Sequence, residues 1–212
     1  MHTLMILALS ALLPGAEAAE SQLDLSFGSQ TTNHDGWEIV GDGYAHLDVG
    51  ARVGVSLGEH LSVLGSYRYG ADGNTVYNDE WNEDDTTDAP GDEFKAAFYG
   101  HTLSVGPKLS GRINRYFAAY GTAQLSGQLA TIRVDADPIL DDDATQLQER
   151  GFAPGVIGAA GLEANLPFNQ RAWTPAVYLE MGYGHTLAMK FDTFGEMNFS
   201  GFYTSWGLGV RF

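Results

Sequence analysis

The sequence predicts an all-β fold, an eight-stranded antiparallel up-and-down transmembrane β-barrel. Eight segments alternate apolar residues with small or polar residues at a period of two, which is typical of a strand with two different faces. The connections between these segments are long and short in strict alternation, with one of medium length before the last segment. After the N-terminal region, no apolar run reaches the roughly 18 residues that a transmembrane helix requires.

The clearest segment is the C-terminal stretch Asn198–Phe212. Its apolar face carries Phe202, Thr204, Trp206, Leu208, Val210 and Phe212. The opposite face carries mostly glycine and serine with one charge, Arg211, and suits a hydrogen-bonded interior better than an oily core. We therefore expect apolar faces to point toward lipid and the small, polar faces to line the lumen.

Earlier segments repeat this alternation. Apolar residues take the odd positions in Gln22–Gln30, Tyr44–Ser56, Leu61–Gly70, Phe94–Ser110, Tyr116–Arg133 and Trp173–Lys190. In Phe152–Leu166 they take the even positions. In Trp173–Lys190 the outward set runs from Val177 to Met189, and the inward set ends with Lys190.

The connections also differ in length according to their side of the barrel. Short turns are expected at Leu57–His60, Gly111–Arg115 and Pro167–Ala172, and long loops at Thr31–Gly43, Ala71–Glu93 and Val134–Gly151. In membrane barrels of this type the short turns face the periplasm and the longer loops face outward. Both termini are therefore expected on the periplasmic side.

A soluble barrel with an apolar interior would show the same alternation. Two observations favour the transmembrane barrel. The non-apolar face is mostly glycine, serine and threonine, which are too small and weakly charged for a solvated exterior. Aromatic residues near strand ends, such as Tyr67, Trp173 and Phe212, suit the interfaces of a membrane.

Residues 1–18 are predicted to be a signal peptide, and residues 19–212 the barrel domain. The apolar run Leu4–Leu13 is too short to span a membrane, and Ala16-Glu17-Ala18 matches a small-x-small cleavage pattern. No Lys or Arg precedes the run, which departs from the usual pattern. The alternative, an N-terminal core helix, leaves Pro14-Gly15 unexplained.

Composition excludes some functions. A net charge of −16 argues against nucleic acid as a partner, because phosphate binding requires a basic surface. The absence of cysteine excludes disulfide and thiol chemistry. The six histidines have no metal-ligand spacing, so we expect no metal site and no cofactor.

Eight charged residues face inward by parity. The acids are Asp24, Asp48, Glu163 and Glu180, and the bases are Arg52, Arg68, Lys108 and Arg211. Because isolated buried charges are costly and side chains fill an eight-stranded barrel, we expect ion pairs that plug the lumen. The alternative is a gated pore whose pairs exchange partners. The sequence leaves open which acid meets which base.

The pentad Tyr-Gly-His-Thr-Leu occurs twice, at Tyr99–Leu103 and Tyr183–Leu187. Parity places His101 and His185 on the outer face. A lipid hydrolase would require a serine and a carboxylate beside such a histidine, and neither pentad is followed by that pattern. We expect no catalytic residues.

With its eight strands, loop asymmetry and ending Gly-Leu-Gly-Val-Arg-Phe212, the chain resembles the small eight-stranded outer-membrane barrels, including the OmpA transmembrane domain and the OmpX/Ail adhesins. The resemblance implies the bacterial outer membrane, contact with its lipid and lipopolysaccharide, and recognition of Phe212 as an assembly signal by the barrel-assembly machinery. Such barrels serve different functions. We expect a structural or surface-interaction role; the alternatives are a narrow channel for small solutes or ions and, less favoured, a lipid-modifying enzyme.

Acidic residues are concentrated in two loops, with nine in residues 72–93 and six in residues 134–151. Such runs are commonly solvated surface. Their carboxylates are also the hard oxygen donors that Ca²⁺ prefers, so weak binding of divalent cations is a second interpretation. The sequence Asp141-Asp142-Asp143 lacks EF-hand spacing.

We expect chelation of divalent cations to expose these acidic loops to proteases. The resemblance implies an anionic lipopolysaccharide leaflet bridged by divalent cations, which would repel unscreened loop carboxylates. Chelation should increase cleavage in residues 72–93 and 134–151 while the strands stay protected, as mapped by mass spectrometry of the fragments. Neutralising Asp141, Asp142 and Asp143 together should remove part of this sensitivity; equal cleavage with and without chelator would leave these acids as a solvated surface.

Overall fold

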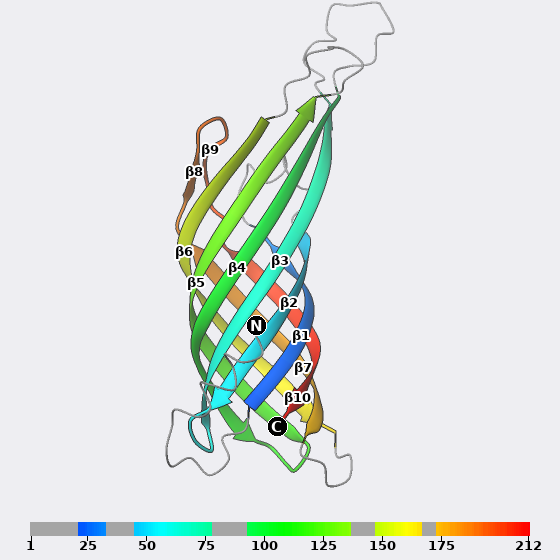
Figure 1. The fold of residues 1–212 in the computed structure, drawn as a ribbon, viewed down its shortest axis with the longest axis vertical. Coiled ribbons are helices and arrows are strands. Elements are labelled where there is room, and N and C mark those ends of the chain that lie inside the picture. The colour runs from blue at the N-terminus through cyan, green and yellow to red at the C-terminus, as the bar shows by residue number, and fades with distance from the viewer. Residues whose placement is uncertain (1–20, 33–44, 78–92, 137–146, 167–172) are drawn as a thin grey trace, which may run out of the picture.

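The structure, a computed structural model, describes residues 21–32, 45–77, 93–136, 147–166 and 173–212. Residues 1–18, the predicted signal peptide, lie outside these ranges. The described residues form a closed barrel of eight strands and a separate hairpin of two short strands (Figure 1). The strands are β1 (Ser21–Thr31), β2 (Ala45–Ser56), β3 (Leu61–Tyr77), β4 (Glu93–Arg112), β5 (Phe117–Ala136), β6 (Leu147–Asn165), β7 (Thr174–Thr186), β8 (Met189–Phe191), β9 (Gly195–Met197) and β10 (Gly201–Arg211).

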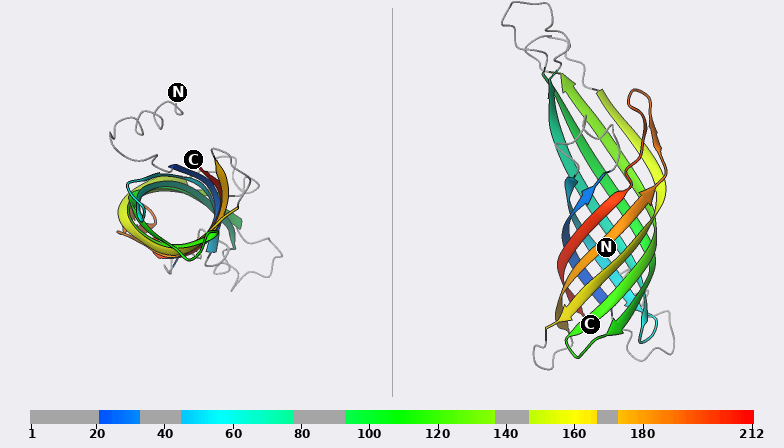
Figure 2. Two further views of the ribbon diagram at one scale, coloured as in Figure 1. Left: turned by 90° about the horizontal axis from the view of Figure 1, so that it is seen from below. Right: turned by 180° about the vertical axis from the view of Figure 1, so that it is seen from behind.

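Every barrel strand pairs antiparallel with its neighbours, in the order β1-β10-β7-β6-β5-β4-β3-β2. The first and last strands close the ring, with a register that runs from Gln22 opposite Arg211 to Gln30 opposite Tyr203. Two further backbone hydrogen bonds join Ser21 and Phe212, with N···O distances of 2.6 and 3.0 Å. Viewed along its axis, the barrel is a closed ring (Figure 2, left). The predicted up-and-down topology is confirmed.

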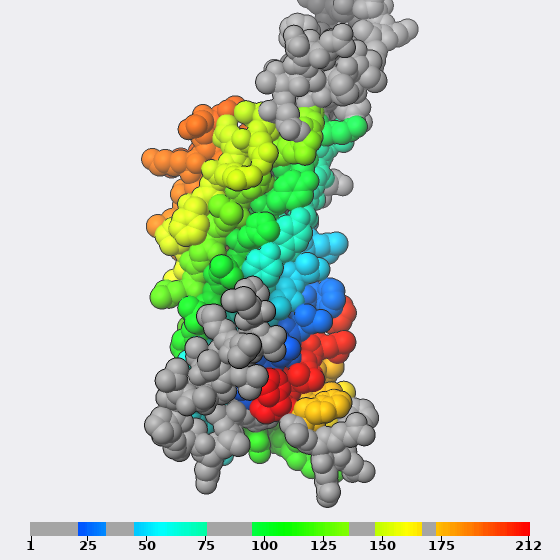
Figure 3. Space-filling view, viewed as in Figure 1, coloured from blue at the N-terminus to red at the C-terminus, as the bar shows by residue number. Residues whose placement is uncertain are grey.

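The alternation of faces is also confirmed. Large apolar side chains cover the outer wall, and three of the most exposed are Leu47 at 76%, Leu125 at 70% and Leu103 at 65%. Figure 3 shows β3, β4 and β5 packed side by side in one face of this outer wall. An apolar surface of this extent is far larger than the patches that soluble monomers expose, so the barrel is transmembrane. Among the described residues, no helix is long and apolar enough to cross a membrane.

Strands β3 to β6 are longer than predicted, at 17 to 20 residues, whereas β1, β2, β7 and β10 have 11 to 13. Pairing continues into both predicted acidic loops, as far as Tyr77 opposite Glu93 and Val134 opposite Leu147. The parts of these loops between the strands, 78–92 and 137–146, lie outside the described residues, as do Asp141–Asp143. Asp72, Asp135 and Glu149 therefore belong to strands and not to loops.

The segment after β7 also departs from the prediction. The chain leaves the barrel wall after Thr186 and forms the β8–β9 hairpin. Strand β9 begins at Gly195, whose φ of 73° is a left-handed conformation that favours glycine. Met189, predicted to face lipid, is fully buried. Lys190, predicted to face the lumen, is exposed and pairs with Glu196 at 3.2 Å.

The buried side of this hairpin packs inside the barrel, against the inward faces of the extended strands. The cluster comprises Ala96, Phe98, Ala130, Ile132, Ala153, Met189, Phe191, Met197 and Phe199. The Phe199 ring stacks on Phe98 of β4 at 5.2 Å, and its carbonyl accepts a hydrogen bond from Gln30 of β1 at 3.1 Å. Because β1 and β4 lie on different sides of the ring, this apolar cluster crosses the lumen.

We expect arginine at Leu179 and arginine at Gly182 to destabilise the barrel for different reasons. Leu179 is 54% exposed on the outer wall, opposite Trp206 and Leu162, so Leu179→Arg should lower the free energy of unfolding in lipid by about 2–4 kcal/mol. Gly182 faces inward, where an added Cβ would lie 2.6 Å from the Tyr203 ring.

The two effects separate when alanine is compared with arginine at each position. Urea titrations in phospholipid vesicles should show a much smaller loss of unfolding free energy for Leu179→Ala than for Leu179→Arg. Alanine leaves an apolar side chain in contact with lipid, whereas arginine places a charge there. Gly182→Ala should already be harmful, because its added carbon meets neighbouring atoms. An unchanged unfolding free energy for Leu179→Arg would contradict the assignment of faces in β7.

Candidate functional site

The candidate site is the charged network in the lumen. All eight charged residues predicted to face inward do so, and their side chains are at most 12% exposed. They come from seven of the barrel strands, because period-two alternation brings every inward face to one axis. Six of the eight form a single connected cluster, and Asp48 and Arg68 form a second pair.

Asp24 on β1 is the centre of the larger cluster and is fully buried. It accepts hydrogen bonds from Arg52, directly opposite on β2, at 3.0 and 3.3 Å. On its other side it accepts one from Arg211 of β10 at 2.5 Å. One carboxylate therefore links the two strands that flank β1, next to the closure of the barrel.

Glu163 on β6 joins the next two bases. Its oxygens accept hydrogen bonds from Arg211 Nε at 2.8 Å and from Lys108 Nζ at 2.9 Å. Lys108 also donates to Gln22 Oε1, and Gln22 Nε2 donates to Asp24, each at 2.9 Å. These contacts form a closed cycle of five side chains. Gln22 was not predicted as part of the site, because a neutral inward residue has no charge to mark it.

Glu180 on β7 binds Arg52 from across the lumen, at 2.8 Å. The hydroxyls of Tyr120 and Tyr203 also donate to Glu180, each at 3.0 Å. The Arg52 guanidinium lies 3.4 Å from the centroid of the Tyr178 ring, a cation–π contact. The three tyrosines were placed on the inward face by parity, but their role was not predicted; a hydroxyl-bearing aromatic at a lumen position is the signal that could have identified them.

The second pair, Asp48 and Arg68, lies next to this cluster, on the side toward the extended ends of β3 to β6. Arg68 Nη1 is 3.9 Å from Asp48 Oδ2, and Asp48 Oδ1 is 3.3 Å from His46 Nε2. The Arg68 guanidinium also lies 4.4 Å from the centroid of the Tyr203 ring. Because Tyr203 binds Glu180, this ring connects the two groups.

Little space remains in the middle of the lumen. The cavity beside Arg52, Arg68 and Glu180 has a volume of about 10 Å³, at or below the minimum for a water molecule. A larger cavity of about 390 Å³ lies at the short-turn end and stops at Tyr120, Lys108 and Glu163. In the described part of the chain, the charged cluster separates this cavity from the apolar cluster at the other end.

The two pentad histidines lie on the outer wall, as parity predicts. Tyr67 and His101 are hydrogen-bonded, with 2.8 Å between the Tyr67 hydroxyl and His101 Nδ1. His185 Nδ1 lies 3.2 Å from Ser200 Oγ, a serine that the sequence pattern did not associate with it. Ser200 makes its other contacts with the backbone of Thr186 and with Asn198. No carboxylate completes a triad with this pair among the described residues.

Metal binding has no site within the described ranges, where no group of three His, Asp or Glu side chains is arranged to hold an ion. The acid runs predicted to bind divalent cations lie mainly outside those ranges. Phe212, the predicted assembly signal, has its ring half exposed on the outer wall, and its backbone is paired with Ser21.

The chain is similar to several solved structures. Ail, the attachment invasion locus protein of Yersinia pestis, in complex with the heparin analogue sucrose octasulfate, is 16% identical, covers 92% of this chain and 99% of its own, and has a TM-score of 0.47. Neisserial surface protein A is 13% identical (93% and 97% coverage, TM-score 0.38), and the N-terminal β-barrel domain of Pseudomonas aeruginosa OprF is 15% identical (91% and 97%, TM-score 0.37). No protein-family model and no curated protein matches the chain.

We expect Asp24→Asn to lower the free energy of unfolding by about 3–5 kcal/mol, because it leaves two buried arginines without their shared counterion. The matched control is Glu196→Gln, which removes an acid from the exposed pair with Lys190 and should change stability by about 1 kcal/mol or less. Urea titration in vesicles, followed by tryptophan fluorescence, measures both variants. Equal, small losses would show that the lumen pairs contribute no more than surface pairs.

Proposed function

We propose that this protein is a barrel of the bacterial outer membrane with a structural or surface-interaction role, whose lumen is plugged and whose termini face the periplasm. The observation that carries the proposal is the filled lumen, where the space beside Arg52 and Glu180 is about 10 Å³. A transmembrane barrel without a path through it acts through its outer wall and its ends. The proposal assigns no catalytic activity to the chain.

Two plugs in series support a non-conducting barrel. The ion-pair cluster around Asp24 crosses the lumen next to the short-turn cavity, and the apolar cluster around Phe98 and Phe199 crosses the lumen in the other half. The two have different chemistry, so conditions that loosen one do not loosen the other. Exchange of ion-pair partners alone would leave the apolar cluster in place.

The difference between the two ends of the barrel supports this orientation. The two described short turns lie at the same end of the barrel as Ser21 and Phe212, and strands β3 to β6 extend beyond the other strands at the opposite end (Figure 1). In outer-membrane barrels the longer connections face outward. We assign the extended strands and the acidic segments after them to the outer surface, where lipopolysaccharide and weakly bound divalent cations are the expected partners.

A planar lipid bilayer distinguishes this proposal from the narrow channel. The purified barrel should give no sustained unitary conductance. A variant in which residues 189–199 are replaced by a short glycine-serine linker, which removes the hairpin and Phe199, should also be silent, because the ion-pair cluster remains. A variant that combines this replacement with Arg52→Ser and Lys108→Ser, which breaks the cycle of side chains, should show openings and so makes the silence of the others informative. Sustained unitary steps from the unaltered protein would favour the channel.

We also propose that Phe212 is read by the barrel-assembly machinery. Its ring is half exposed, whereas its backbone completes the pairing with Ser21, so the two contributions can be separated. Phe212→Ala should leave refolding in detergent unchanged but reduce the folded protein in outer-membrane fractions, as seen by the different gel mobility of boiled and unboiled samples. If Phe212→Ala left the amount of folded protein in cells unchanged, the Phe212 ring would not be an assembly signal.

A further inference from the structure

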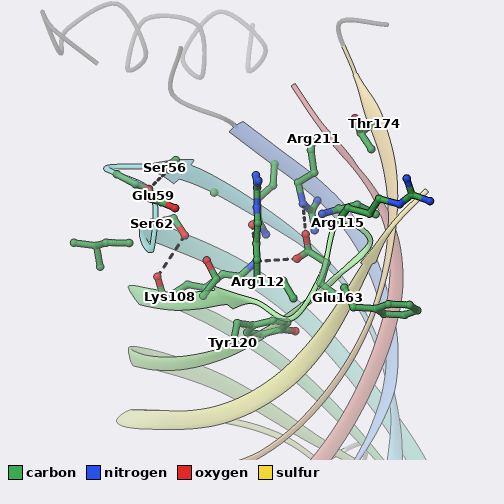
Figure 4. Close-up of a pocket in the computed structure, with 18 of the residues that line it drawn as sticks. Ser56, Glu59, Ser62, Lys108, Arg112, Arg115, Tyr120, Glu163, Thr174 and Arg211 are labelled. Carbon is green, nitrogen blue, oxygen red and sulfur yellow. Dashed lines mark hydrogen bonds and ion pairs between the residues drawn. The ribbon is translucent and has the colours of Figure 1, made fainter. Parts of the chain in front are cut away.

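The mouth of the barrel at the short-turn end contains a cavity of about 390 Å³. It lies between the β2–β3 turn, the β4–β5 turn and the ends of β6, β7 and β10 (Figure 4). Its volume falls within the roughly 300–1,000 Å³ of small-molecule sites. Serine and threonine hydroxyls from several strands, including Ser56, Ser62 and Thr174, line its sides.

The lining is basic in a protein that is strongly acidic. Four bases and two acids line the cavity, and the two acids are Glu59 and Glu163. The bases are Lys108, Arg112, Arg115 and Arg211. The lining thus has a net charge of +2, whereas the chain has −16. Low-dielectric walls concentrate such a field at the mouth.

In the wall of this cavity is a buried donor without an acceptor (Figure 4). The Arg211 side chain is 5% exposed, with Nε bonded to Glu163 and Nη1 to Asp24. Nη2 is buried and has no hydrogen-bond partner among the described residues; the same is true of Asn165 Oδ1, also in the lining. Two carboxylates therefore hold the guanidinium in one orientation, and its remaining nitrogen requires an acceptor.

Arg112 and Arg115 add charge at the rim. Both are exposed, and neither forms an ion pair with any residue in the described ranges. The Arg115 guanidinium lies 4.4 Å from the centroid of the Tyr116 ring, and β5 begins directly after Tyr116. Planar guanidinium groups bind carboxylate and phosphate oxygens in pairs, which selects these groups over halide ions.

We infer that this mouth binds a small, polar anion that carries a carboxylate or a phosphate. The anion's oxygen accepts from Arg211 Nη2 in the wall, Arg112 and Arg115 bind it from the rim, and the serine and threonine hydroxyls bind its polar groups. In the orientation proposed above, the ligand comes from the periplasm, either as a free solute or as the head group of an anionic lipid. The binding itself does not depend on that orientation.

The test uses the full barrel in nanodiscs of phosphatidylcholine, with inorganic phosphate and citrate as probes. Proton–nitrogen NMR of arginine side chains reports on Arg211 directly, and calorimetry gives the affinity. Phosphate or citrate should shift the Arg211 guanidinium resonance in a saturable way, with the larger affinity for the anion that fills more of the cavity. Nanodiscs that contain phosphatidylglycerol distinguish the two sources: a shift before any probe is added identifies the lipid head group.

A matched pair of variants separates a site from general screening. Arg112→Gln with Arg115→Gln should weaken binding about tenfold or more, through loss of two charge-assisted contacts. Arg133→Gln with Lys190→Gln removes the same charge from exposed pairs on the extended strand β5 and the β8–β9 hairpin, and should leave affinity unchanged. Equal weakening by both pairs, or no saturable shift of Arg211 in the unaltered protein in either lipid, would show a water-filled mouth and overturn the inference.

Discussion

The pairing of β1 with β10 is the constraint on which the rest of this structure depends. In lipid, every backbone N–H and C=O must be bonded within the protein, and a sheet meets this requirement only when its first and last strands join. Closure in turn places eight inward faces around one narrow axis. Side chains that are distant in sequence, such as Arg52 and Glu180, therefore come into contact across the lumen.

The narrow interior explains why glycine and charge occur together on the inward faces. A Cβ at Gly209 would collide with the Asp24 carboxylate, and one at Gly207 would collide with the Tyr178 ring. Glycine on β10 thus provides the space in which a larger side chain from β1 or β7 crosses the axis. The acids among these side chains are paired with bases, and Asp24, Glu163 and Glu180 each accept more than one hydrogen bond, which offsets the loss of water.

Parity alone predicted the inward or outward direction of all eight charged residues and of the aromatic residues in β10, because the period of a strand leaves only two choices. Partners within the lumen could not be predicted, because they depend on register and on contacts across the axis. The strand ends could not be predicted either: Asp72 and Asp135 look like loop residues, but backbone pairing between the strands continues through them. Met189 fits the outward pattern of β7 equally well, and only the departure of the chain after Thr186 places it inside.

The same closure has a consequence for the order of events during synthesis. The partner of Gln22 is Arg211, so one edge of the first strand has nothing to pair with until almost the entire chain has been made. Until then the sheet has two open edges and an outer face of leucine, valine and phenylalanine, the features that promote aggregation in water. An unfinished barrel therefore has to be protected from aggregation. The pairing of the first strand with the last, which spans almost the whole sequence, is also the last pairing to become available.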